Sequence, residues 1–185
     1  MMRSAFVRIP PELAAQGIGL RPEAEADDAY LLALYATTRQ AELDQMADWS
    51  PEQRQAFVAM QFNAQRHHYR HAIPNVAFDV ITRDGEPIGR LYTREGETML
   101  HIVDILIDPA LRGAGIGTAL LQSLADEARA GGKVLSIFVE TYNPAKRLYE
   151  RLGFVPVGEP REFFLEMEIP LPASLGAALE GSGPN

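Results

Sequence analysis

The residues of this sequence that could do chemistry gather in two short stretches. One is a glycine-rich segment that follows an apolar run and precedes residues at helical spacing; it contains Arg112, Gly113, Ala114, Gly115, Ile116, Gly117 and Thr118. The other carries Asn143 and Tyr149, six residues apart. A glycine loop that opens a helix directs backbone N–H groups and the positive end of the helix dipole to one point. The first stretch therefore favours a bound phosphate or pyrophosphate group.

The spacing of the glycines distinguishes between the known classes of phosphate-binding loop. A dinucleotide-binding loop has the form G-x-G-x-x-G, but Thr118 stands where the third glycine would be. A P-loop requires a lysine before Ser or Thr, and this segment has none. The pattern that fits is R-x-x-G-x-G, from Arg112, Gly115 and Gly117. The plainer alternative is an ordinary glycine-rich turn between a strand and a helix.

This loop resembles the acyl-CoA pyrophosphate loop of the GNAT superfamily of N-acetyltransferases. The run N-P-A-K-R-L-Y-E-R-L-G-F, from Asn143 to Phe154, resembles the signature that follows the fifth strand in that family. The resemblance covers residues 18–169 and implies that Asn143 hydrogen-bonds the pantetheine arm of the cofactor. It also implies that Tyr149 donates its proton to the leaving thiolate. From the residues alone, Asn143 can equally be a helix N-cap and Tyr149 a core residue.

The fold implied by the resemblance is α/β and sandwich-like. A mixed central sheet of about six to seven strands, mostly antiparallel with one splayed parallel pair, would be flanked by about four helices. The strands should splay where Ile107 and Val139 end. The pantetheine would lie against the backbone of Ile105, Leu106 and Ile107, and the pyrophosphate would accept from N–H groups between Ala114 and Thr118. Arg112 would shape the loop.

Hydrophobic periodicity and turn residues predict the order of the elements. A helix should begin after the capping pattern of Ser50, Pro51 and Gln53, and Asp84-Gly85 should close a hairpin. An earlier helix should follow the acidic run 23–28 and bury Ala29, Leu32, Ala33 and Ala36. Strands are expected at 18–22, 76–81, 88–92, 99–107, 134–139, 154–157 and 163–169. Residues 1–17 are then an N-terminal arm, 18–169 the acetyltransferase domain, and 170–185 a tail with a short helix between Ala173 and Leu179.

The general base is the least defined part of the site. Many members of the resembled family carry a glutamate on the strand before the loop, and His101 occupies the corresponding position here. A histidine titrates near neutral pH and could serve as the base. Glu97, Asp104, Glu140 or a water molecule are alternatives, and each of these carboxylates can also be a solvated charge at a strand end. Tyr92 is a further candidate for the substrate pocket.

Composition and charge exclude several other classes. The 185 residues contain no cysteine, which removes disulfides, thiolate metal sites and a cysteine acyl-enzyme, and a formal charge of −8 argues against nucleic acid. No apolar run is long enough for a membrane span and no signal peptide is evident, so we expect a cytoplasmic protein. His67 and His71, with His68 between them, have the spacing of a metal pair, but a polar helix end is the favoured reading and no metal is expected.

The two motifs, through the family that they resemble, imply an N-acyltransferase that moves an acetyl group from acetyl-CoA to a primary amine by direct attack in a ternary complex. Tyr149 would be the general acid, and His101 is the first candidate for the base. The alternative is a non-catalytic acyl-CoA-binding module that acts as a sensor or partner domain. The acceptor, a small molecule or a peptide, would enter over the first helices, and the last strands and tail are natural places for a homodimer contact.

Overall fold

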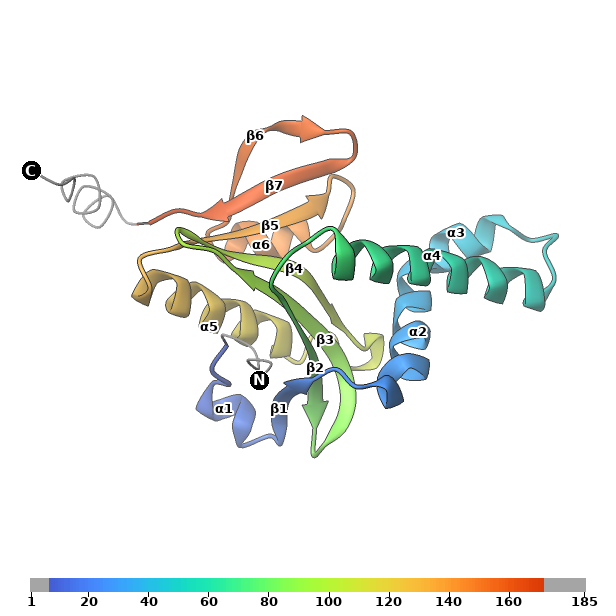
Figure 1. Cartoon of the computed structure of the whole chain (residues 1–185), viewed down its shortest axis with the longest axis horizontal. Coiled ribbons are helices and arrows are strands. Elements are labelled where there is room, and N and C mark those ends of the chain that lie inside the picture. The colour runs from blue at the N-terminus through green and yellow to red at the C-terminus, as the bar shows by residue number, and fades with distance from the viewer. Residues whose placement is uncertain (1–6, 172–185) are drawn as a thin grey trace, which may run out of the picture.

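A seven-stranded mixed sheet forms the centre of the computed structural model, which describes residues 7–171. The strand order is β1-β2-β3-β4-β5-β7-β6, and β4 and β5 are the parallel pair (Figure 1). The predicted fold class is therefore confirmed. The strands are β1 (Ile18–Pro22), β2 (Val76–Arg83), β3 (Glu86–Glu95), β4 (Met99–Ile107), β5 (Val134–Glu140), β6 (Val155–Arg161) and β7 (Phe164–Ile169).

Helices lie on both faces of this sheet. They are α1 (Pro11–Ala14), α2 (Asp28–Ala36), α3 (Gln40–Gln45), α4 (Pro51–His71), α5 (Ile116–Ala130) and α6 (Lys146–Arg151). Successive strand residues point to opposite faces. Leu91 accordingly joins the core under α5, while the neighbouring Tyr92 contacts Tyr69 of α4 with ring centroids 6.2 Å apart. The sheet thus has an α5 face and an α4 face.

The main core lies on the α5 face. One side of α5 buries Ile116, Leu120, Leu121 and Leu124 against the apolar residues of β3, β4, β5 and β7. Residues of the predicted N-terminal arm also join this core, because Val7 and Leu13 are 9% and 2% exposed. The short helix α1 in this arm was not expected. Residues 1–6 and the tail from 172, including the helix predicted between 173 and 179, lie outside the described residues.

A smaller apolar cluster joins α2 to α4 on the other side of the sheet. Ser50 caps α4 as predicted: its hydroxyl accepts from the Gln53 N–H at 3.3 Å, and the Gln53 side chain accepts from the Ser50 N–H at 2.8 Å. The predicted buried side of the earlier helix was wrong. That helix, α2, buries Leu31, Leu34 and Tyr35, because its larger apolar side chains pack against α4. The helix α3 was also not expected.

An extra residue in β4 controls where the sheet opens. Tyr92 of β3 faces Asp104, but the next residue, Thr93, faces Ile102, so Val103 has no partner in this ladder. Such a β-bulge bends the strand and interrupts regular pairing. The parallel pairing with β5 ends at the same place, at Ile102 and Ile137. The splay therefore begins well before Ile107 and Val139, where the sequence placed it.

Candidate active site

The opening between β4 and β5 is the first part of the candidate site. Four residue pairs join these strands, from Met99 with Val134 to Ile102 with Ile137. Residues 103–107 of β4 continue beside β3 but have no pairing with β5. The predicted pantetheine-contacting residues Ile105, Leu106 and Ile107 are all in this segment, and each is partly buried. The structure thus places an unpaired strand edge where an extended ligand could add to the sheet.

The glycine loop lies at the end of this unpaired segment. Gly113 and Gly115 have φ angles of 80° and 81°, a left-handed conformation that favours glycine. Gly115 is the N-cap of α5, and the first hydrogen bond there runs from the Ala119 N–H to the Gly115 carbonyl at 2.9 Å. The N–H groups of residues 116–118 consequently lack acceptors within the helix. The amides that a pyrophosphate needs are therefore presented together.

Contacts around the loop fix its shape. The Arg112 Nε donates to the Ile107 carbonyl at 3.3 Å, so this side chain links the loop to the end of β4. A Cβ on Gly117 would stand 3.2 Å from the Cδ1 of Ile107. The first turn of α5 thus packs closely on the end of β4. This close packing brings the predicted pyrophosphate and pantetheine positions next to one another.

The second motif buries Tyr149 in α6, close enough to feel the charge of Asp104 at the opening. Asn143 Oδ1 accepts from the Ala145 N–H at 2.9 Å, which shapes the turn into α6. Tyr149, in α6, is 6% exposed and packs edge-on against Phe154 with ring centroids 5.6 Å apart. Burial, followed by the Asp104 carboxylate of β4, raises the pKa of Tyr149 to about 12. Its hydroxyl therefore keeps its proton at neutral pH and is available as a donor.

His101 lies outside the splayed segment. It pairs with Ser136 in the closed part of the sheet, and its Nδ1 lies 2.7 Å from the Ser136 Oγ. Its ring also packs edge-on against Phe138, with centroids 5.2 Å apart. Burial, helped by the positive charge of Arg94, lowers the pKa of His101 to about 4. The imidazole is therefore neutral at pH 7 and a weaker base than an exposed histidine.

Asp104 lies within the splayed segment and on the α4 face. The bulge at Val103 puts it on the same face as His101, although these residues are three apart. Arg90 of β3 donates to the Asp104 carboxylate at 2.5 Å and to Gln65 of α4 at 2.9 Å. Arg90 is only 3% exposed. This ion pair holds the Asp104 carboxylate at the opening, where it also influences Tyr69 and Tyr149.

A second polar cluster ties α4 to the beginning of the domain. The carboxylate of Glu23, whose side chain is 4% exposed, accepts from Arg66 at 3.1 Å and from Arg70 at 2.6 Å. It also accepts from the Tyr92 hydroxyl at 2.5 Å. Arg66 reaches Asp28 at 2.7 Å as well. Tyr92, a candidate pocket residue, therefore belongs to a cross-linked polar layer between the sheet and α4.

The sequence alone did not predict most of the polar contacts between the sheet and α4. The residues around Asp104 come from β3 and α4, and no local spacing connects them with it; they are Arg90, Gln65 and Tyr69. The available signal was Arg90 and Tyr92, which flank Leu91 in the middle of β3. The other carboxylate candidates lie apart: Glu97 is exposed in the turn before β4, and Glu140 ends β5 beside Tyr142.

The histidines of α4 stay at the surface. The rings of His67 and His71 stack with centroids 4.1 Å apart, and His71 Nδ1 contacts the His67 carbonyl at 2.9 Å. In the described part of the chain, no group of three or more His, Asp or Glu residues could hold a metal ion. Within residues 7–171, no helix has the length and hydropathy to cross a membrane.

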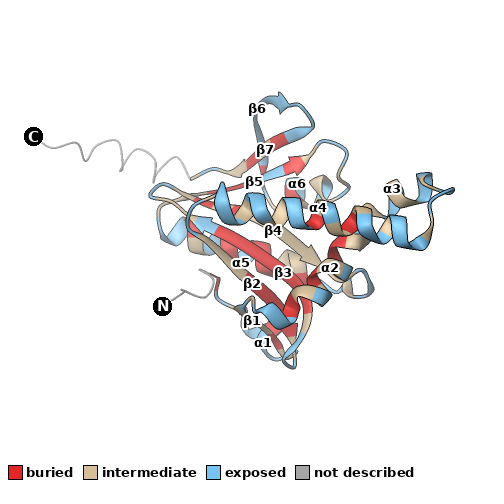
Figure 2. Ribbon diagram, turned by 45° about the vertical axis from the view of Figure 1, so that its right-hand side comes forward, coloured by how far each residue is buried: buried red, intermediate tan, exposed pale blue. Residues whose placement is uncertain are grey.

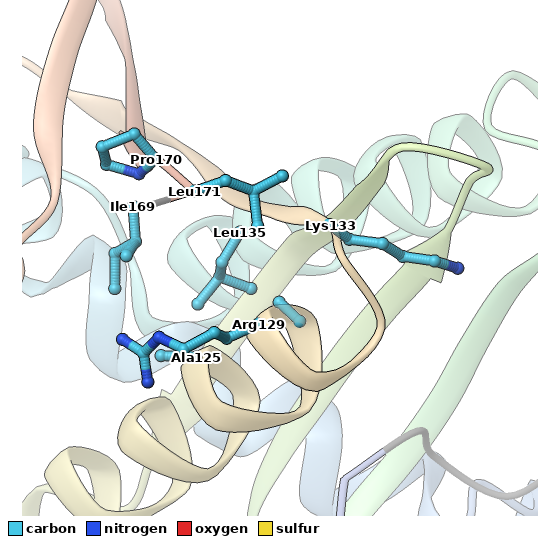
Figure 3. Close-up of a pocket in the computed structure, with 8 residues that line it drawn as sticks. Ala125, Arg129, Lys133, Leu135, Ile169, Pro170 and Leu171 are labelled. Atoms are coloured by element: carbon cyan, nitrogen blue, oxygen red, sulfur yellow. The ribbon is translucent and has the colours of Figure 1, made fainter. Parts of the chain in front are cut away.

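A small pocket lies at the far end of α5 from the glycine loop. It is lined by residues at the end of that helix and at the neighbouring ends of β5 and β7, among them Leu135 and Ile169 (Figure 3). Its two cationic side chains are already engaged: Arg129 donates to Asp126 at 2.8 Å, and Lys133 contacts Glu95 at 2.5 Å. This pocket contains none of the residues predicted for the active site.

Comparison with known proteins supports the reading of these motifs. Residues 45–168 match the family model described as the acetyltransferase (GNAT) domain. The chain is 36% identical over 63 residues to glucosamine 6-phosphate N-acetyltransferase of Trypanosoma brucei brucei, a match covering 34% of this chain and 42% of that protein. It is 34% identical over 76 residues to an acetyltransferase of Agrobacterium fabrum, covering 40% and 55%. The matches thus span about half the length of these curated relatives.

Solved structures show the same fold. The PaiA N-acetyltransferase of Thermoplasma acidophilum, crystallised in complex with coenzyme A, aligns over 82% of this chain and 97% of its own, with a TM-score of 0.58. Its sequence identity to this chain is 15%. At that identity the likeness concerns the arrangement of the elements alone.

Proposed function

The chain belongs to the acetyltransferase (GNAT) family, and from this premise we propose that it transfers an acetyl group from acetyl-CoA to a primary amine. Three features at or near the opening in the sheet support the proposal. These are the N–H groups that begin α5, the unpaired edge of β4 and the buried hydroxyl of Tyr149. They would serve the pyrophosphate, the pantetheine and the thioester of acetyl-CoA, respectively.

The cofactor would be held mainly by backbone groups. The pyrophosphate would accept from N–H groups between Ala114 and Thr118, where the α5 dipole adds favourable electrostatics. The pantetheine amides would pair with β4 near Ile105 and Ile107, and Asn143 would hydrogen-bond the same arm. The proposal is supported by the likeness in fold to a relative crystallised with coenzyme A. No metal is needed for this binding.

The chemistry is a direct acyl transfer in a ternary complex. A neutral amine attacks the thioester carbonyl carbon, a C–N bond forms, and the C–S bond breaks with its electron pair leaving on sulfur. Tyr149 donates its proton to that thiolate, and the proton that the attacking nitrogen loses in becoming an amide returns to the phenolate through the general base or water. A thiol has a pKa near 8.5 and is a stronger acid than this phenol, so the transfer depends on that returning proton, which restores the neutral phenol. An N–H group of the splayed segment, such as that of Ile105, would polarise the carbonyl oxygen.

His101 and Asp104 are the two candidates for the general base that removes a proton from the incoming ammonium group. His101 has the appropriate chemistry but a lowered pKa, and its Nδ1 is engaged by Ser136. Asp104 lies in the splayed segment, where its carboxylate could act directly or through a water molecule. Separate His101→Gln and Asp104→Asn variants distinguish them: the variant of the base should lose activity mainly at pH values where the amine is protonated.

A thiol-release assay tests the proposal against a non-catalytic acyl-CoA-binding module. The amine panel should contain an alkylamine, an amino acid, glucosamine 6-phosphate and a lysine peptide. We expect turnover of at least one amine, a loss of about a hundredfold in kcat for Tyr149→Phe, and unchanged acetyl-CoA affinity in that variant. Tyr142→Phe is the matched control, because Tyr142 is 70% exposed in the preceding loop. Acetyl-CoA binding without turnover of any amine would favour the module.

A further inference from the structure

The β5–β7–β6 part of the sheet has one face that no described helix covers. Leu135, Ile137 and Val139 of β5 point into the core under α5. The alternate side chains of these strands point to the α4 face, but α4 and α2 lie over β2, β3 and β4 (Figure 1). We call the exposed surface the open face, and its large apolar residues are Phe138, Val155, Val157 and Phe164.

These apolar side chains are unusually exposed for strand residues. Phe138 is 50% exposed, Val155 48%, Val157 40% and Phe164 46%. Figure 2 shows β6 as exposed along its length. Single exposed apolar residues are ordinary, but several of them on neighbouring strands of one face indicate an interaction site.

The pairing of β5, β7 and β6 places carboxylates of β7 between apolar side chains of the two outer strands. Across the three strands, Phe138 faces Glu166, and Glu166 faces Val157. In the next row, Glu168 lies between Ser136 and Val155. Neither Glu166 nor Glu168 forms an ion pair within the described residues, whereas the carboxylates of Glu23 and Asp104 under α4 are neutralised by arginines. Burial and the neighbouring charge of Glu166 raise the pKa of Glu168, which agrees with two close, uncompensated carboxylates.

This surface continues to the opening in the sheet. Phe138 of β5 lies against His101 of β4, at the last pairs before the strands separate. Neighbouring strands are about 4.8 Å apart, so an extended chain running from the opening across β5, β7 and β6 would meet Phe138, then Glu166, then Val157. The side-chain order along that path is apolar, acidic, apolar.

We infer that the open face binds a basic, apolar segment of a polypeptide and presents one of its amines at the opening, so that the acceptor is a polypeptide. This inference rests on the proposed acetyl transfer and specifies its acceptor. Two unpaired carboxylates among apolar side chains complement lysine or arginine that shares one face of an extended peptide with apolar residues. A flat sheet face suits an extended polypeptide, because small ligands are bound in concave sites. The same charge disfavours a phosphorylated acceptor.

Binding to an extended model peptide that carries leucine, lysine and leucine at every second position, with serine between them, tests the inference without requiring turnover, because these side chains all point to one face. Its counterpart has glutamate in place of each lysine. Titration followed by amide NMR should show the basic peptide shifting resonances of β5, β6 and β7. Glu166→Gln/Glu168→Gln should weaken binding about tenfold at low salt, the loss expected for two partly exposed ion pairs. The control Glu12→Gln/Glu25→Gln changes net charge equally at exposed positions in α1 and before α2, and should bind normally.

The outcomes separate this inference from the proposed function. Equal affinity for the acidic peptide, or unchanged affinity in the Glu166/Glu168 double variant, overturns the polypeptide acceptor. A stable dimer in sedimentation that Phe138→Ser dissociates also overturns it, because a second copy would then cover the open face. If small amines are acetylated and the basic peptide neither binds nor reacts, acetyl transfer stands and the polypeptide acceptor fails. If no amine reacts but the basic peptide binds the open face, the docking surface stands and acetyl transfer fails.

Discussion

Arg90 and Asp104 form an ion pair across β3 and β4, with a nitrogen–oxygen distance of 2.5 Å, in a setting where the arginine side chain is 3% exposed. Taking a charged pair out of water is costly, and its attraction must repay that cost. The pair is therefore more informative about the position of Asp104 than about net stability. It keeps a carboxylate beside the opening and next to a buried phenol.

Replacing only one partner of this ion pair should destabilise the protein more than its attraction is worth, because the other charge is left buried without a partner. Replacing both partners together should cost less than the two single changes added. Arg90→Leu should lower the free energy of unfolding by about 3–5 kcal/mol, because it leaves a buried carboxylate uncompensated. Arg90→Leu/Asp104→Leu should lose less than the sum of the single changes. Urea unfolding measures all three. The reference is Asp126→Asn, which removes an exposed pair with Arg129 and should cost less than about 1 kcal/mol. Additive losses would show that the two residues are not coupled.

The raised pKa of Tyr149 has a direct consequence for activity at alkaline pH. The acid must be protonated to donate, and a pKa of about 12 keeps it protonated well beyond the ordinary value for tyrosine, near 10. The kcat measured with acetyl-CoA in excess should therefore stay level up to about pH 10. A kcat that declines with an apparent pKa at or below 10 contradicts this environment for the phenol, provided that circular dichroism shows the protein still folded.

Gly115 should be required for cofactor binding. Its φ of 81° at the N-cap of α5 is strained for alanine, so Gly115→Ala should cost about 1 kcal/mol of stability and raise the Kd for acetyl-CoA about tenfold by turning loop amides away from the pyrophosphate. Gly158→Ala is the matched control, since Gly158 has a φ of 69° in β6. It should lose similar stability and keep its affinity in calorimetric titrations. Equal affinities in the two variants would remove the loop from the cofactor site.

Mild acid should destabilise the fold through His101. Its pKa is about 4 in the folded protein and near 6.5 when unfolded, so the unfolded state binds more protons between these values. Stability must then fall as the pH drops through this window. Between pH 7 and pH 5 the protein should lose about 2 kcal/mol more than His101→Gln in urea unfolding. Parallel losses in both proteins would assign the acid sensitivity to carboxylates instead.

Local sequence features accounted for the elements that local chemistry determines. Ser50 and Gln53 form the predicted capping box, and Asp84, with a φ of 51°, and Gly85 close the predicted hairpin. The helix predicted after the glycine loop is α5, although it begins at Ile116, inside the predicted loop, with Gly115 as its N-cap. In each case the decisive contacts lie within a few residues, so the pattern contained the information.

The parts that were not predicted depend on partners distant in the sequence. The buried side of α2 is chosen by α4, and the ion pair of Asp104 needs Arg90 and Gln65 from other elements. The bulge at Val103 could not be predicted either, because its apolar neighbours have the pattern of one continuous strand. Residues four apart in a regular strand point to the same face, but the extra residue puts His101 and Ile105 on opposite faces of the sheet.

The short ladder between β4 and β5 also has a consequence for the dynamics of the sheet. Four residue pairs join these strands, whereas six join β5 to β7, and the bulge at Val103 ends the shorter ladder. We expect local opening of the sheet to begin at this junction, beside Ile102 and Ile137. An extended molecule bound in the gap would oppose that opening by bridging β4 and β5. Slower amide exchange on each side of the junction, and not only at the contact itself, would be its signature.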